Sequence, residues 1–302
     1  MAVNCVAYYH AYRMTHFAIA GEQTRAPQRL NGWQRAAVLA AGVTVPRPVN
    51  SRTPADLGWQ FRTVTITTRD GVTLEVWEIP HDNSVAVVAM FHGYAMSKDS
   101  LLHEAAVFRE LGGHVLLADH RGAGGSAGNT TTLGWEEALD VAAVAGWAGQ
   151  QQPRRRLILY GQSLGAAAVL RAVATEKVQA DGLVLEAPFD RLLTTVGHRY
   201  RAMHLPAFPL AHLLVVWGGV QHGYNAFALN PAVDARAVAC PALVTIGDRD
   251  PWIGVDEARA VATAMPGGAT LKVFENVGHE SICRAAPEAY RRAIRDWWGQ
   301  TR

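Results

Sequence analysis

The stretch LILYGQSLGAAAVL, residues 157–170, changes from a strand pattern to a helix pattern at one residue, Ser163. The apolar and aromatic residues before it are typical of a buried strand, and the alanine-rich run after it is typical of a helix. Gly161 and Gly165 flank the serine, as a tight strand-to-helix turn requires, because a Cβ there would collide with the neighbouring strand or helix. Such a turn strains the serine backbone and exposes its hydroxyl at the strand end.

The spacing Gly-x-Ser-x-Gly is unlikely to be accidental. With 7 serines and 28 glycines in 302 residues, roughly 0.06 matches are expected by chance. A serine hydroxyl becomes a nucleophile when a base takes its proton and hydrogen-bond donors hold the oxyanion that its attack creates. The helix after Ser163 directs its free N–H groups and positive dipole end at the same point. The stretch therefore predicts nucleophilic catalysis, with a purely structural turn of small residues as the alternative.

A base and an orienting acid should follow at the ends of later strands. His279 follows the last expected strand and is the predicted base. The loop after the preceding strand contains two carboxylates, Asp248 and Asp250. We favour Asp250, which lies far enough round that loop to approach the histidine ring. Asp190, after the sixth strand, is a third candidate for the acid.

The oxyanion needs two backbone N–H donors. Leu164, directly after the nucleophile, is predicted to supply one of them. The other is predicted to come from Tyr94, in the loop after the third expected strand, where Gly93 precedes the tyrosine. His92 is expected to hold this loop by hydrogen bonding rather than to take part in the chemistry.

The fold class is predicted to be α/β, with a mostly parallel eight-stranded sheet and helices on both faces. From Phe61 onward, short β-rich runs alternate with longer helical ones, as this class requires. Asp70-Gly71 predicts a hairpin, so the sheet should begin antiparallel and then turn parallel. The expected strands are 61–68, 72–79, 85–91, 114–118, 156–161, 182–187, 242–247 and 270–275. The expected helices are 99–111, 134–149, 164–176, 255–264 and 286–298.

Two segments lie outside this alternation. Residues 1–58 are predicted to form an N-terminal helical extension packed on the sheet, and 59–302 the main domain. Within that domain, about 189–238 is too long for a simple connection and suggests a helical cap insertion. The cap is apolar, so its side chains must be buried against the domain, against the substrate, or both. Phe208 and Trp217 are its candidate substrate-binding residues.

Composition excludes several other classes of protein. The 28 basic and 26 acidic residues nearly cancel, which argues against nucleic acid or an anionic membrane surface as a partner. The 3 cysteines lack Cys-x-x-Cys spacing, and no His-Glu-x-x-His pattern occurs, so no disulfide framework or zinc site is expected. The longest apolar stretch, 205–220, contains two prolines and is too short to span a bilayer. No signal peptide is recognised, so a cytoplasmic location is expected unless an export signal has been removed.

One motif formally suggests a different function, the binding of a dinucleotide. Residues 122–127 match the Gly-x-Gly-x-x-Gly/Ala dinucleotide fingerprint. That fingerprint should open a helix directly after a strand, but 119–121 precede the glycines and 130–133 separate them from the next helix. We therefore expect no nucleotide cofactor and no metal.

The motifs together resemble the α/β-hydrolase superfamily in order and spacing over roughly residues 60–300. They are His92-Gly93, Asp119 to Ser126, Gly161 to Gly165, Gly247 to Pro251 and Gly278-His279. Within that superfamily the chain is similar to bacterial serine esterases and lipase- or aminopeptidase-like hydrolases with a small helical cap. The resemblance implies a catalytic triad of Ser163, Asp250 and His279 and no cofactor.

The expected function is hydrolysis of small-molecule carboxylic esters of short to medium acyl chains through an acyl-enzyme intermediate. The cap offers no obvious acidic residue to hold the free amino terminus of a substrate, so an esterase is favoured over an aminopeptidase. A thioesterase or a peptidase or amidase with the same triad is an alternative. A non-catalytic binding protein on this fold is another, because fold alone does not determine function.

Overall fold

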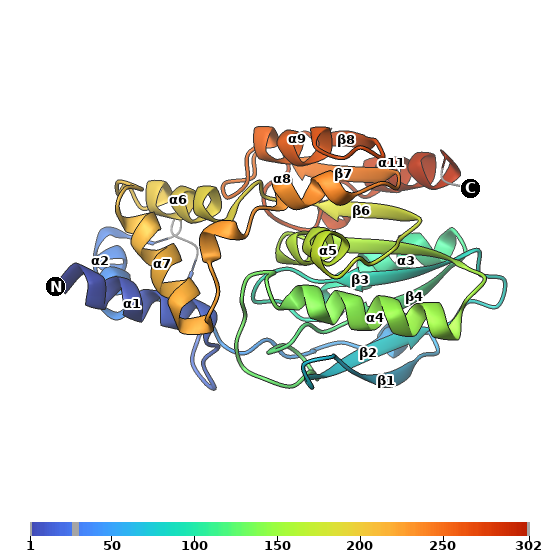
Figure 1. The fold of residues 1–302 in the computed structure, drawn as a ribbon, viewed down its shortest axis with the longest axis horizontal. Coiled ribbons are helices and arrows are strands. Elements are labelled where there is room, and N and C mark those ends of the chain that lie inside the picture. The colour runs from blue at the N-terminus through green and yellow to red at the C-terminus, as the bar shows by residue number, and fades with distance from the viewer. Residues whose placement is uncertain (1, 26–29, 301–302) are drawn as a thin grey trace.

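The chain folds around one eight-stranded sheet, seen in a computed structural model that describes residues 2–25 and 30–300 (Figure 1). The strands are β1 (Arg62–Thr67), β2 (Thr73–Ile79), β3 (Ala86–Phe91), β4 (Gly113–Ala118), β5 (Arg156–Gln162), β6 (Gly182–Glu186), β7 (Ala242–Gly247) and β8 (Ala269–Phe274). Their order is β1-β2-β4-β3-β5-β6-β7-β8. β2 runs antiparallel to β1 and to β4, and the other neighbours are parallel. The predicted fold class and the antiparallel start are confirmed.

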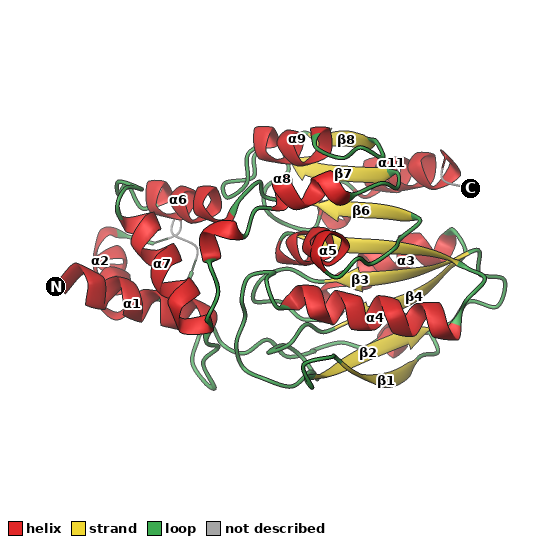
Figure 2. Cartoon of the chain, viewed as in Figure 1, coloured by secondary structure: helices red, strands yellow, loops and turns green. Residues whose placement is uncertain are grey.

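Helices cover both faces of the sheet because its central strands are apolar on both sides (Figure 2). One face carries α4 (Glu137–Gln151), α5 (Leu164–Thr175) and α9 (Val255–Thr263), and the other carries α3 (Leu102–Glu110) and α11 (Pro287–Gln300). Each face of the sheet buries its own apolar core. In β3, Phe91 packs into the core on the side of α4, α5 and α9, and its neighbour Met90 packs into the core on the side of α3 and α11. A fully buried strand therefore reads as a continuous apolar run, which made these strands recognisable in the sequence.

The cap consists of α6 (Leu192–Ala202) and α7 (Leu210–His222), and it lies beyond the carboxyl ends of the parallel strands (Figure 1). Helices α1 (Ala2–Thr15) and α2 (Gly32–Ala41) lie beside it. The short helices are η2 (Pro54–Leu57), η3 (Lys98–Leu101), η4 (Ala226–Ala228), α8 (Pro231–Asp234), η5 (Ala235–Ala237) and α10 (Ile282–Ala285).

The N-terminal helices do not pack on the sheet, so that prediction is wrong. Helix α1 lies against α7, where Trp217 Nε1 donates to Asn4 Oδ1 at 3.2 Å and Gln221 Nε2 donates to the Tyr8 carbonyl at 2.7 Å. The Tyr8 ring also meets the Trp217 ring edge-on, with 5.5 Å between centroids. Helix α7 is apolar along most of its length, and α1 covers part of its surface.

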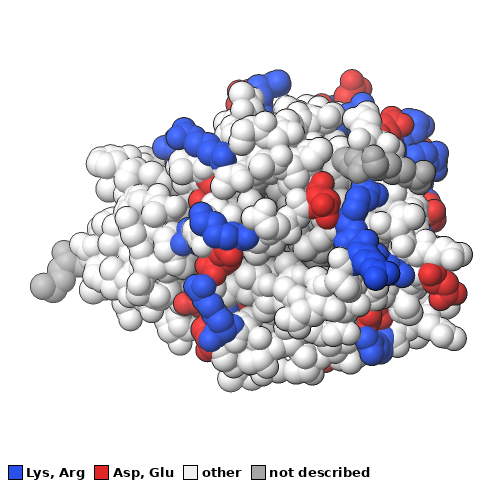
Figure 3. Space-filling view, turned by 45° about the vertical axis from the view of Figure 1, so that its right-hand side comes forward, with Lys and Arg blue, Asp and Glu red and all other residues white. Residues whose placement is uncertain are grey.

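Helices α1, α2, α6 and α7 form a separate lobe. On the face seen in Figure 3 this lobe carries few charged side chains, whereas the part of the molecule that contains the sheet carries many of both signs. Several large apolar side chains of the lobe are solvent-exposed, among them Trp33 and Phe208. Across the described residues, no helix is both long and apolar enough to cross a membrane.

Candidate active site

Ser163 lies at the sharp turn between β5 and α5, as its flanking glycines predicted. Its φ of 52° and ψ of −109° lie in a region that L-residues rarely adopt. The Ser163 N–H donates to the Glu186 carbonyl of the neighbouring strand at 2.8 Å, which holds the turn against the sheet. A Cβ on Gly165 would clash with the Phe91 carbonyl oxygen and would lie 2.8 Å from the His92 carbonyl oxygen. The helix can therefore begin this close to β3 only with glycine at position 165.

Asp250 and His279 come together across the carboxyl ends of β7 and β8. His279 Nδ1 lies 2.6 Å from Asp250 Oδ2. The other Asp250 oxygen accepts the backbone N–H groups of Trp252 at 2.8 Å and Ile253 at 3.0 Å, and its side chain is fully buried. A carboxylate can only accept here, so the histidine carries its proton on Nδ1 and presents an unprotonated Nε2. This is the tautomer that a general base requires.

The two other candidate acids lie elsewhere. Asp248 is exposed at the end of β7, and Asp190 accepts the N–H of Arg191 at 2.6 Å. Asp250 is the carboxylate that His279 contacts among the described residues.

Glu186, at the end of β6, links the serine turn to the histidine loop. Its Oε1 accepts from Gln162 Nε2 at 2.9 Å and from the Ile282 N–H at 3.2 Å, and its Oε2 accepts the Tyr160 hydroxyl at 3.1 Å. One fully buried carboxyl group therefore binds the residue before Ser163 and the loop three residues after His279. Within the described chain, no hydrogen bond joins Ser163 Oγ to His279, a contact that commonly tightens only in the substrate complex.

A second buried carboxyl group, Glu104 of α3, lies beneath the same loop. Its Oε1 accepts the hydroxyl of Ser281, two residues after His279. Burial, with the nearby charge of Glu186, raises the pKa of Glu104 to about 8, so it is mostly protonated at neutral pH. Sequence reasoning missed both glutamates. Glu186 left one signal, a charged residue closing an otherwise apolar strand, whereas Glu104 left none in its helix.

The loop after β3 holds Tyr94 beside the serine turn. Over residues 2–25 and 30–300, neither the Tyr94 N–H nor the Leu164 N–H is bonded to an acceptor, so both remain available as donors. His92 supports this loop, as expected. Its Nδ1 bonds the Gly93 carbonyl at 2.9 Å and its Nε2 accepts the His120 N–H at 3.1 Å. Burial lowers the pKa of His92 to about 4, which keeps it neutral in this role.

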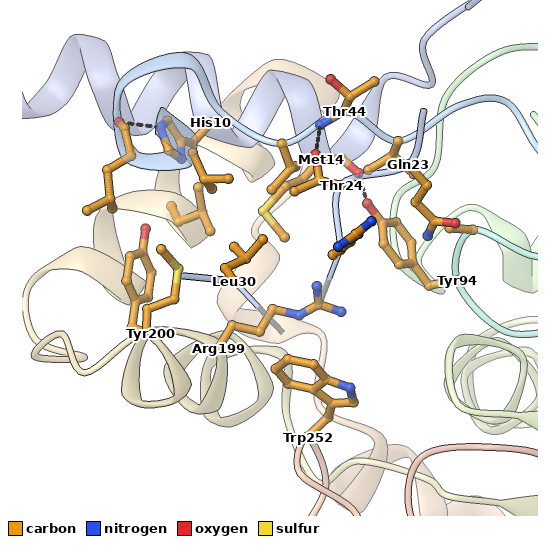
Figure 4. A pocket seen from close by; sticks show the side chains of 18 residues that line it. His10, Met14, Gln23, Thr24, Leu30, Thr44, Tyr94, Arg199, Tyr200 and Trp252 are labelled. Carbon is orange, nitrogen blue, oxygen red and sulfur yellow. Dashed lines mark hydrogen bonds between the residues drawn. The ribbon is translucent and has the colours of Figure 1, made fainter. Parts of the chain in front are cut away.

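A cavity of about 250 Å³ adjoins the Tyr94 loop, between the cap and the N-terminal helices (Figure 4). Tyr94 and Trp252 connect it to the site, since Trp252 also donates its N–H to Asp250. Neither Ser163 nor His279 lines the cavity, so the cavity adjoins the site without containing it. Its lining residues are His10, Met14, Gln23, Thr24, Arg25, Leu30, Val38, Leu39, Val43, Thr44, Val45, Tyr94, Ala95, Arg199, Tyr200, Met203, Leu214 and Trp252.

The two predicted cap residues lie outside this cavity. Phe208 is 73% exposed, and Trp217 packs on α1. The position of Trp217 favours the packing role that the sequence left open. For Phe208, the expectation that the apolar side chains of the cap are buried is wrong, because the ring is largely exposed to solvent. A role in substrate binding stays a prediction for both residues.

The glycine-rich segment that resembled a dinucleotide fingerprint surrounds a buried ion pair instead. The Gly125 N–H donates to Asp119 Oδ2 at 2.9 Å, and Lys98 Nζ forms a salt bridge with the same carboxylate. A Cβ on Gly124 would collide with the Asp119 side chain. These glycines are therefore explained by close packing. Within the described part of the chain, no three His, Cys, Asp or Glu side chains form a group that could hold a metal ion.

Comparison with known proteins finds relatives in sequence and in fold. Residues 82–213 match a family model described as serine aminopeptidase, S33. An uncharacterised protein of Mycobacterium tuberculosis is 31% identical over 223 residues, which are 72% of this chain and 72% of that protein. A lysophosphatidylserine lipase of Xenopus tropicalis is 23% identical over 256 residues, 76% of this chain and 62% of that protein. An esterase of Pyrococcus furiosus superimposes with a TM-score of 0.70 at 24% identity, covering 84% of this chain and 96% of that one.

Proposed function

The chain belongs to the α/β-hydrolase superfamily, and we propose that it is a serine hydrolase that cleaves carboxylic esters of short to medium acyl chains. The observation that carries the proposal is the 2.6 Å contact between His279 Nδ1 and Asp250 Oδ2, at the same sheet edge as the strained Ser163 turn. A histidine held in this tautomer at the same sheet edge as a half-buried serine is the arrangement that can activate a hydroxyl nucleophile.

In the proposed reaction, Ser163 Oγ attacks the ester carbonyl carbon while His279 Nε2 takes the hydroxyl proton. The N–H groups of Tyr94 and Leu164 hold the oxyanion of the tetrahedral intermediate. The intermediate collapses as the C–O bond to the alcohol breaks, and His279 returns the proton to the leaving alcohol. Water then attacks the acyl-serine with the same base and donors, which releases the carboxylic acid and regenerates Ser163.

Esters are favoured over aminoacyl amides by the residues around the site. An aminopeptidase needs an anionic group to hold the substrate ammonium, and no aspartate or glutamate is among the described residues that line the adjoining cavity. The name of the matching family keeps a peptidase as the second candidate. A panel of aryl esters of rising acyl length, run beside an aminoacyl anilide, separates the two. Faster cleavage of the anilide than of every ester would replace the esterase proposal with the peptidase.

The test of the nucleophile is Ser163→Ala, which should lower kcat/KM on an aryl ester by several orders of magnitude while the protein stays folded. A fluorophosphonate probe should label the wild type once, at Ser163, and leave the variant unlabelled. Ser84→Ala is the matched control, because Ser84 lies before β3 at the opposite end of the sheet. Wild-type turnover by Ser163→Ala would refute the proposal, and unreactive wild type would favour a binding protein.

A further inference from the structure

Arg199, on α6 of the cap, extends into the cavity that adjoins the site (Figure 4). Its guanidinium lies 5.6 Å from the ring centre of Tyr94 and 5.2 Å from that of Trp252. A hydrogen bond also holds each of these two residues. The Tyr94 hydroxyl donates to the Met14 carbonyl at 2.6 Å, and the Trp252 carbonyl bonds His198 Nδ1 at 2.7 Å. The guanidinium therefore lies near two aromatic rings, one from the predicted oxyanion loop and one from the loop that carries Asp250.

Among the described residues, no carboxylate forms a salt bridge or hydrogen bond with the Arg199 guanidinium. Burial lowers the pKa of Arg199. Cation–π contacts with the two aromatic faces favour the charged form and offset part of this effect. A cation–π contact engages none of the five N–H donors of a guanidinium, so these donors can still bind an anion.

The rest of the cavity matches one kind of ligand. Its walls are mostly aliphatic, with side chains such as Leu30, Val38 and Leu214. Arg25 contributes a second cationic side chain, and no acidic residue is among the lining residues described. Apolar walls with an unpaired guanidinium suit a molecule that has both an aliphatic portion and an anionic group.

We propose that this cavity recognises an anionic oxygen group of the ester substrate, a carboxylate or a phosphate, through the guanidinium of Arg199. The inference rests on the proposed esterase activity and specifies its substrate class. Arg199 is a specificity residue in this role. In this proposal, its guanidinium pairs with the substrate anion at a distance from the reacting carbonyl. Tyr94 links the two places, because its side chain lines the cavity and its backbone N–H is a proposed oxyanion donor.

The test uses two matched pairs of esters with the full-length protein. Each pair has one ester that ends in a carboxylate and one in which that carboxylate is capped as an N-methyl amide, which is neutral and adds no second ester bond. One pair carries the group on the acyl chain and the other on the alcohol, so either orientation of the substrate is covered. In at least one pair, the wild type should prefer the anionic ester by about tenfold or more in kcat/KM. A third ester with a terminal phosphate in place of the carboxylate identifies which anion fits better.

Arg199→Gln should abolish this preference, and Arg199→Lys should leave an intermediate one, because lysine keeps the charge but loses the planar fork. Arg201→Gln is the matched control. It removes the same charge from an exposed position of the same helix and should keep the wild-type preference. Two results would overturn the inference: a wild type that prefers the capped ester in both pairs, or an Arg199→Gln protein that keeps the anionic preference. Failure of the wild type to hydrolyse any ester would instead refute the proposed function.

Discussion

The substitution Asp250→Asn tests the proposed triad at the residue where its geometry is most constrained. One Asp250 oxygen accepts two backbone N–H groups, at 2.8 and 3.0 Å, and the other contacts His279 Nδ1 at 2.6 Å. An asparagine must place its amide oxygen on the two N–H groups, so its NH₂ group faces the histidine. Nδ1 then has to accept a hydrogen bond, and the imidazole proton moves to Nε2, where it blocks transfer from Ser163.

The expected loss is about 10⁴-fold in kcat/KM, which corresponds to about 5 kcal/mol of transition-state stabilisation. The fold should survive, because the side chain keeps its two backbone bonds and loses only the charge of the third. Initial rates on an activated aryl ester from pH 6 to 9, together with thermal unfolding, measure both effects.

Asp248→Asn and Asp190→Asn are the matched controls, since each removes one carboxylate of the same region without touching His279. Both should retain more than a tenth of wild-type kcat/KM. The reasoning fails if Asp250→Asn stays within tenfold of the wild type. A larger loss in Asp190→Asn than in Asp250→Asn would instead identify Asp190, which follows β6, as the acid that orients His279.

Two further predictions concern stability. Gly165→Ala should destabilise the protein by about 3 kcal/mol or more in chemical denaturation, because the new methyl group meets the backbone carbonyls of Phe91 and His92. Gly149→Ala is the control: it lies in open space on α4 and should be neutral or stabilising by up to about 1 kcal/mol. Equal effects of the two substitutions would contradict the close approach of α5 to β3. The pKa of Glu104, about 8 against an ordinary 4.5, is raised in the folded protein, so the stability that it contributes is complete below pH 4.5 and is lost as the pH rises through 8. Glu104→Gln, which can still accept from Ser281, should therefore gain stability relative to the wild type between pH 5 and 8.5, by at most about 5 kcal/mol, and a pH-independent difference would disprove the burial of a protonated carboxyl group there.

The sheet and the serine turn could be predicted from the sequence because their signals are local. A strand buried on both faces needs a continuous apolar run, so β3, β5 and β7 were recognisable with bounds correct to within one residue. The turn requires small residues within two positions of Ser163, and the two glycines stand at those positions. His279 could be named because the end of a strand determines on which edge of the sheet a following side chain lies.

Contacts between distant segments could not be predicted, because the strand order and the placement of helices decide them. The sequence left three acids open, and only the loop after β7, bent by two N–H bonds to Asp250, brings one of them to His279, 29 residues away. The position of α1 on α7 instead of the sheet depends on contacts between residues 213 positions apart, such as Trp217 with Asn4 and Gln221 with Tyr8.

Arg199 shows the difference most clearly. In the sequence it is one basic residue in a polar stretch of helix, with no pattern that sets it apart. Its unpaired guanidinium beside the site exists because Tyr94 and Trp252, from loops more than 150 residues apart, lie on two sides of it. The sequence by itself determined the turn at Ser163, the strand end that His279 follows and the sheet that positions both, since each depends on neighbouring residues. Which carboxylate contacts His279, where the two buried glutamates lie and what charge the cavity carries depend on segments that meet only in the folded chain.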